Sequence, residues 1–179
     1  MNYCQIIKDD VANGPGIRLS LFVSGCSNRC EGCFQPKTWD PDYGKLFTAS
    51  VLENILTELS KPYYTGITLL GGDPFYPSNL TEVASIINAI HLKLDNTRTI
   101  WIYTGYTYEQ LLSKDDPTIN RILDQSDVLV DGPFILSRKN MFIAFRGSDN
   151  QRIIDLKKTA MNNHTPVIIT EYERSHKHE

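Results

Sequence analysis

Three cysteines near the amino terminus constrain this chain more than any other feature. Cys26, Cys30 and Cys33 fall within eight residues, with the spacing C-x3-C-x2-C. Thiolates are soft ligands that suit iron–sulfur clusters and zinc. A [4Fe–4S] cube has one more iron than this loop has sulfurs, so a cube bound here would leave one iron without a protein ligand. An open coordination position allows chemistry at a metal, whereas electron-carrying clusters are usually closed by four cysteines.

A zinc site is the main alternative for this loop. Structural zinc usually takes four ligands, often from two C-x2-C pairs. The remaining cysteine, Cys4, lies on a different segment, and the four histidines are distant from the loop in sequence. We therefore expect a cluster held by Cys26, Cys30 and Cys33, with Cys4 a buried thiol outside the site.

Composition and charge narrow the class of protein. The chain has 179 residues, 41% hydrophobic and 22% charged, which suits one globular domain over residues 1–179. The net charge of −3 with scattered Lys and Arg argues against a nucleic-acid partner. No apolar run approaches the roughly 20 residues of a membrane span, and the first residues do not resemble a signal peptide. We expect a cytoplasmic protein with no membrane partner and with residues 171–179 as a disordered tail.

Apolar strand-like runs alternate with helix-like segments along the chain. The predicted strands are 19–23, 66–70, 99–103, 128–130 and 166–170. The predicted helices are 51–59, with a capping box at Ser50–Glu53, then 79–94, 108–112, 119–124 and 152–160. This alternation predicts an α/β fold with a mostly parallel sheet. A full eight-unit barrel takes about 250 residues, so we expect an incomplete open (β/α) barrel of about five or six units.

Three unusual segments directly follow the first three predicted strands. They are the cysteine loop, Gly71-Gly72-Asp73-Pro74 and Thr104-Gly105-Tyr106. Parallel α/β folds bring such strand ends to one face, where active sites form. The glycine pair could be only a tight turn. Beside a cluster, however, its bare backbone could receive the amino or carboxylate group of a small zwitterion.

Three other loops keep two interpretations. Asn13-Gly14-Pro15-Gly16 is either a tight turn or part of a partner surface near the cluster, and Asp131-Gly132-Pro133 has the same ambiguity. The polar stretch 146–151 is typical of a turn followed by a helix cap.

The motifs described above, in this order, make the chain resemble the radical S-adenosylmethionine (SAM) superfamily. Within it, the chain looks like the activating proteins of anaerobic ribonucleoside-triphosphate reductase. The matching blocks are Asn13–Arg18, Leu21–Cys26, Cys30–Phe34, Thr38-Trp39, Gly71–Pro74, Trp101–Tyr106, Val130–Gly132 and Arg146–Gln151. Gly32 stands where many superfamily members have an aromatic residue, and Phe34 stands where this branch usually has Tyr.

The resemblance implies a radical SAM fold and a glycyl-radical-generating enzyme. Cys26, Cys30 and Cys33 would hold three irons, and SAM would chelate the fourth. The residues expected around SAM are Gly32, Cys33, Phe34, Gly71, Gly72 and Asp73. Reduced flavodoxin or a similar donor would supply an electron, and a 5′-deoxyadenosyl radical would take hydrogen from a glycine of the reductase. Since the cofactors carry this chemistry, no catalytic residues beyond the cluster and SAM are expected.

Other functions fit parts of the pattern. A radical SAM enzyme acting on a small molecule, such as a modified purine precursor, would share the cysteine loop and the glycine pair. An iron–sulfur electron carrier or a zinc-binding interaction module would share the cysteines alone.

Overall fold

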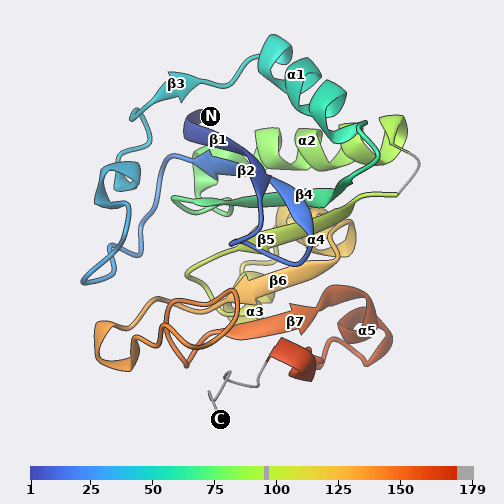
Figure 1. The fold of residues 1–179 in the computed structure, drawn as a ribbon. Helices are drawn as coiled ribbons and strands as arrows, with labels where there is room; N and C mark the ends of the chain where they lie inside the picture. Colours follow the sequence, from blue (N-terminus) through green and yellow to red (C-terminus); the bar gives the residue numbers. More distant parts are fainter. Residues whose placement is uncertain (95–96, 173–179) are drawn as a thin grey trace.

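The computed structural model describes residues 1–94 and 97–172. Within these ranges the strands form one open sheet with the order β3-β1-β2-β4-β5-β6-β7 (Figure 1). The strands are β1 (Asn2–Asp10), β2 (Ile17–Val23), β3 (Lys45–Leu46), β4 (Tyr64–Gly71), β5 (Thr99–Tyr103), β6 (Val128–Asp131) and β7 (Arg152–Asp155). β2, β4, β5 and β6 are parallel, whereas β1 and β7 run antiparallel to their inner neighbours.

α-Helices lie along one face of the sheet, and all but the last connect the parallel strands (Figure 1). They are α1 (Ala49–Leu59), α2 (Leu80–Lys93), α3 (Tyr108–Leu112), α4 (Pro117–Asp124) and α5 (Leu156–Met161), with short 3-10 helices η1 (Pro36–Trp39), η2 (Pro77–Asn79), η3 (Leu136–Arg138) and η4 (Thr170–Tyr172). Alternate residues of the strands pack against the helices to form the main core, because successive side chains of a strand point to opposite faces. In the described part of the chain, no helix is long and apolar enough to span a membrane.

The predicted α/β fold with a parallel centre is confirmed, but a barrel of five or six units is not. Among the described residues, three crossovers join the four parallel strands. A further parallel strand would need a connection that returns the chain to the amino ends of the strands. The long segment between β6 and β7 stays at the carboxyl ends of the parallel strands. β7 therefore runs back antiparallel to β6, and the sheet remains open.

Several local predictions were wrong. β1 was not predicted, because its polar, partly exposed sequence lacks the apolar run of a buried strand. The predicted helix at 152–160 begins only at Leu156, where the Asp155 side chain caps it, and its first residues form β7. The predicted capping box at Ser50–Glu53 is replaced by Thr48, whose hydroxyl accepts from the Val51 backbone N–H.

The carboxyl-terminal segment pairs with β7 and covers the second face of the sheet. Part of the predicted strand at 166–170 is extended, with an antiparallel bridge between Ile154 and Ile168. The Tyr172 ring then packs edge-on against Trp101 and Phe145. Of the predicted disordered tail, Glu171 and Tyr172 belong to η4, and residues 173–179 lie outside the described residues.

A buried arginine ties the amino ends of three parallel strands together. Arg18 of β2 donates from Nε to Thr68 Oγ1 at 2.7 Å and from Nη2 to the Thr99 carbonyl at 3.0 Å, and its guanidinium lies over the Trp101 ring. The 13–16 loop lies beside it, and the Asn13 carbonyl accepts from Thr68. This loop therefore lies at the amino ends of the parallel strands, whereas the cysteines lie at their carboxyl ends. The suggestion that it lies near the cluster was wrong.

A second ionic network fixes the other end of the sheet and leads to a stability prediction. Arg152 donates from Nε to the buried Asp131 carboxylate at 2.9 Å and forms two bonds with Glu109. Arg152→Ala would leave Asp131 buried without its cation, so we expect the free energy of unfolding to fall by about 2 kcal/mol. Chemical denaturation measures this change.

The exposed pair between Arg138 and Asp149 offers a matched control. Arg138→Ala should change the free energy of unfolding by less than about 1 kcal/mol. Equal losses in the two variants would contradict the role assigned to Asp131.

Candidate iron–sulfur site

The cysteine loop leaves the carboxyl end of β2 and closes on itself. Gly25 N–H donates to the Thr38 carbonyl at 2.8 Å, and Cys26 N–H donates to the Trp39 carbonyl at 3.3 Å. A tight turn brings the Cys33 N–H to the Cys30 carbonyl at 3.1 Å. These bonds hold the three cysteines on one ordered loop outside the core.

Each of the three sulfurs has a hydrogen-bond donor nearby. The Asn28 side-chain amide lies 3.8 Å from Cys26 Sγ, and the Gln35 N–H lies 3.4 Å from Cys33 Sγ. The Phe134 backbone N–H, from the segment after β6, lies near the Cys30 thiol and acts to lower its pKa. Donors aimed at sulfur favour the thiolate form, which is the form that binds metals.

Burial opposes these donors. It raises the pKa of the Cys26 and Cys30 thiols, and it also raises the pKa of Cys4 on β1. All four cysteines are free thiols. A thiol with a raised pKa gives up its proton when a metal cation binds, so metal loading of this loop releases protons.

Asp73 joins the cysteine loop to two strand ends. Its fully buried carboxylate accepts from Asn28 Nδ2 at 2.9 Å, from the Phe75 N–H at 2.9 Å, from Thr104 Oγ1 at 3.0 Å and from the Gly105 N–H at 3.1 Å. Burial raises the pKa of Asp73 to about 6, although the bonds from these donors lower it. The predicted meeting of the three strand-end segments on one face is confirmed, and Asp73 is the group that joins them.

The glycine pair packs against the cysteine loop. Gly72 N–H donates to the Val23 carbonyl at 2.7 Å, and the Asp73 N–H donates to the Gly25 carbonyl at 2.8 Å. A Cβ atom on Gly72 would lie 2.6 Å from the Gly25 oxygen and 3.0 Å from the Thr38 oxygen. Glycine is therefore required here for close approach of two backbones.

The remaining predicted residues lie on the outer side of the loop. Gly32 has a φ of +71°, and a Cβ atom there would lie 2.8 Å from Leu136 Cδ1. Phe34 is exposed, and its ring centroid lies 5.5 Å from that of Phe134. From the third strand end, Tyr106 reaches the loop through a 2.9 Å hydrogen bond between its hydroxyl and Ser27 Oγ.

Sequence reasoning missed two residues that support the loop. Asn28 links the Cys26 sulfur to Asp73, and Phe134 approaches Cys30 from the segment after β6. Neither has a sequence signal, since both act through contacts between distant segments. The polar stretch 146–151 also lies at this edge, where Gln151 Nε2 donates to the Gly132 carbonyl at 3.1 Å.

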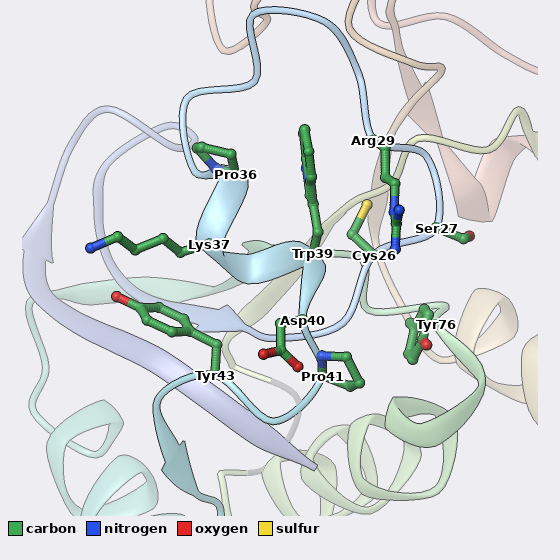
Figure 2. Close-up of a pocket in the computed structure, with 10 residues that line it drawn as sticks. All are labelled: Cys26, Ser27, Arg29, Pro36, Lys37, Trp39, Asp40, Pro41, Tyr43 and Tyr76. Carbon is green, nitrogen blue, oxygen red and sulfur yellow. The ribbon is translucent and has the colours of Figure 1, made fainter.

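An open cleft of about 700 Å³ lies beside Cys26 (Figure 2). Its lining residues are Cys26, Ser27, Arg29, Pro36, Lys37, Trp39, Asp40, Pro41, Tyr43 and Tyr76. Its volume is in the range of small-ligand sites. Among the described residues that line it, only Cys26 belongs to the predicted site.

Comparisons with known proteins support an iron–sulfur cofactor. A family model described as a 4Fe-4S single cluster domain matches residues 12–154. An anaerobic ribonucleoside-triphosphate reductase-activating protein of Enterobacteria phage T4 is 39% identical over 155 residues, covering 86% of this chain and 93% of that protein. Proteins of the same name from Vibrio cholerae and Escherichia coli K12 are 38% and 35% identical, covering 86% and 88% of this chain and 97% and 100% of their own lengths.

Proposed function

The chain belongs to the family of anaerobic ribonucleoside-triphosphate reductase-activating proteins, and we propose that Cys26, Cys30 and Cys33 hold the iron–sulfur cluster with which it activates that reductase. The matching iron–sulfur domain includes all three cysteines. One observation carries the proposal. Three free thiols lie on one loop, and the buried Asp73 carboxylate anchors that loop to the ends of β4 and β5.

The cysteine loop suits a cube better than a single ion. Within residues 1–94 and 97–172, no three His, Cys, Asp or Glu side chains are gathered as they would be around one metal ion. In a [4Fe–4S] cube each thiolate binds a different iron, so the ligands stand apart. Donors from Asn28, Gln35 and Phe134 would stabilise the ligated sulfurs and tune the reduction potential of the cluster.

We place SAM at the iron that the cysteines leave open. The residues proposed to border it are Gly32, Cys33, Phe34, Gly71, Gly72 and Asp73. When bound, the cluster and SAM would supply the one-electron chemistry needed to remove a hydrogen atom from a glycine of the reductase. Both oxygens of Asp73 are bonded to protein donors, so Asp73 is a positioning residue that holds Asn28 and Gly105.

The protein is an enzyme that acts on a partner protein, and its proposed type is radical SAM. The site lies at the carboxyl ends of β2, β4 and β5, beside an open cleft, where a partner's main chain can approach. Docking of the partner would complete the exclusion of water from the reacting groups. We assign the supply of electrons to reduced flavodoxin or a similar one-electron donor.

An anaerobic activation assay tests the proposal. The reconstituted protein, SAM, a reductant and the reductase should yield 5′-deoxyadenosine together with the doublet signal of a glycyl radical in electron paramagnetic resonance. Formation of 5′-deoxyadenosine without a radical on the reductase would contradict the activase assignment and favour a small-molecule substrate. Absence of both products in a protein with a full cluster would contradict the SAM chemistry.

Gly72 gives a prediction about how the glycine pair contributes. In Gly72→Ala the new methyl group would press on the Gly25 and Thr38 carbonyls and displace the cysteine loop. We expect iron and sulfide content after reconstitution to fall, in addition to the affinity for SAM. Metal and sulfide analysis measures this effect.

Gly66 provides the matched control, because a Cβ atom there would meet the Thr99 backbone at the far end of β4. Gly66→Ala should destabilise the fold and leave the cluster content of the folded protein unchanged. A Gly72→Ala protein with a full cluster and weak SAM binding would show instead that Gly72 only makes room for the ligand.

A further inference from the structure

Exposed apolar side chains border the cysteine loop on the side that faces the segment after β6. We call this set, together with the partly buried Phe134, the apolar rim; it consists of Phe34, Phe134, Leu136, Met141 and Phe142. Phe34 is 63% exposed, Met141 71% and Phe142 69%. Scattered exposed apolar residues need no explanation, but a group of them beside a reactive site marks a surface that another molecule covers.

The inner part of the apolar rim touches the residues that hold the cluster. The Phe34 ring, on the residue that follows Cys33, lies 5.5 Å from the Phe134 ring between centroids, and the Phe134 N–H lies near the Cys30 thiol. Leu136 packs against the backbone between Cys30 and Cys33, since a Cβ atom on Gly32, whose φ is +71°, would lie 2.8 Å from Leu136 Cδ1. The apolar rim is therefore continuous with the site.

The outer part of the apolar rim sits on a loop whose base is fixed. Lys139 and Ser148 form an antiparallel bridge, and the Asn140 N–H donates to the Gly147 carbonyl at 3.1 Å. The Asn140 side chain then accepts from the Phe142 N–H at 2.9 Å. In Figure 1 this orange loop projects from the same edge of the sheet as the light-blue cysteine loop. Met141 and Phe142 are thus presented to solvent by an ordered loop.

We propose that the apolar rim is the docking surface for the loop of the reductase that carries the target glycine. This inference rests on the proposed function. A glycine that loses hydrogen at the cluster must approach the cysteine loop at the carboxyl ends of the strands. The reductase would then cover the apolar rim, because the apolar rim is continuous with that loop. Methionine and aromatic side chains are enriched at such interfaces, where a few well-packed residues carry most of the binding energy. Lys139, with its Nζ 5.2 Å from the Phe34 ring centroid, places a cation at the edge of this surface.

The double variant Met141→Ser with Phe142→Ser tests the proposal. Both side chains are largely exposed, so the fold and the cluster content should be preserved. Affinity for the reductase, measured anaerobically by sedimentation, should fall about tenfold or more, and glycyl radical formation at limiting protein should fall with it. Slow cleavage of SAM in the absence of the reductase should match the wild type. Met141→Asp is a second variant, which places a charge in the same interface.

Leu92→Ser with Met161→Ser is the matched control. These side chains are 74% and 86% exposed and lie on α2 and α5, away from the cysteine loop. This variant should bind and activate the reductase like the wild type.

Three results would overturn the inference. Unchanged reductase affinity in both rim variants would show that the apolar rim is not the docking surface. A rim variant that loses only self-association would assign the surface to a second copy of this chain. An equal loss of reductase affinity in the control variant would show that the effect is not specific to the apolar rim. Failure of the proposed function is distinguishable, because the wild-type protein itself would then cleave SAM without binding or activating the reductase.

Discussion

Cys30→Ala is expected to abolish the cluster, so that the anaerobically reconstituted protein retains little iron or acid-labile sulfide. Three thiolates already leave one iron of the cube without a protein ligand, so two thiolates should not retain the cube. Cys30 lies between the other two ligands on the loop. The fold should persist, because the loop lies outside the core formed by the sheet and α1 to α4. Glycyl radical formation should fall to background. Iron and sulfide analysis, with circular dichroism for the fold, measures both effects.

Cys4→Ala is the matched control for this experiment. Cys4 is also a free, partly buried thiol, but it belongs to β1 and lies outside the loop. The variant should keep its cluster and its activity. A Cys30→Ala protein with full iron and sulfide, or a Cys4→Ala protein without them, would require a different ligand set.

Asp73→Ala is expected to lower the free energy of unfolding by about 3 kcal/mol or more. The carboxylate satisfies two backbone N–H groups and the side chains of Asn28 and Thr104 in a fully buried place. Each buried donor left without an acceptor costs about 1–3 kcal/mol. The cysteine loop should also lose its anchor, so cluster content should fall. Denaturant titration of the apoprotein and metal analysis of the reconstituted protein measure the two effects.

Two further variants separate stability from cluster binding. Asp149→Ala removes an exposed carboxylate paired with Arg138 and should change the free energy of unfolding by less than about 1 kcal/mol. Asn28→Ala removes the link between Asp73 and Cys26, and should weaken cluster binding by about 10–100-fold with a smaller loss of stability than Asp73→Ala. An Asp73→Ala protein as stable as the wild type would contradict the anchoring role.

Local sequence patterns predicted the centre of the fold well. The run 99–103 matches β5, because a strand buried on both faces is apolar at nearly every position. β1 pairs at the edge of the parallel strands and is exposed along much of its length, so its sequence lacks that pattern. β7 was mistaken for a helix because Ile153, Ile154 and Leu156 also fit a helical repeat, and only the pairing with β6 determines the choice.

For the site, the sequence indicated the candidate ligands but not the residues that support them. Cys26, Cys30 and Cys33 are close in sequence and carry their chemistry in their spacing. The parallel strand order predicted that the three strand ends meet. The role of Asp73 as an anchor depends on Asn28 and Thr104, which are 45 and 31 residues away, so no local pattern could reveal it. The contact of Phe134 with Cys30 is hidden for the same reason, since it spans most of the sheet.

The most direct test of the open iron is electron–nuclear double resonance on the reduced protein mixed with SAM that is isotopically labelled in its methionyl amino and carboxylate groups. If Cys26, Cys30 and Cys33 leave one iron for SAM, both labels should couple strongly to the cluster spin, and neither coupling should appear with S-adenosylhomocysteine present in excess before SAM is added. A cluster of full iron and sulfide content that shows no coupling to either label would contradict the assignment of SAM to this iron.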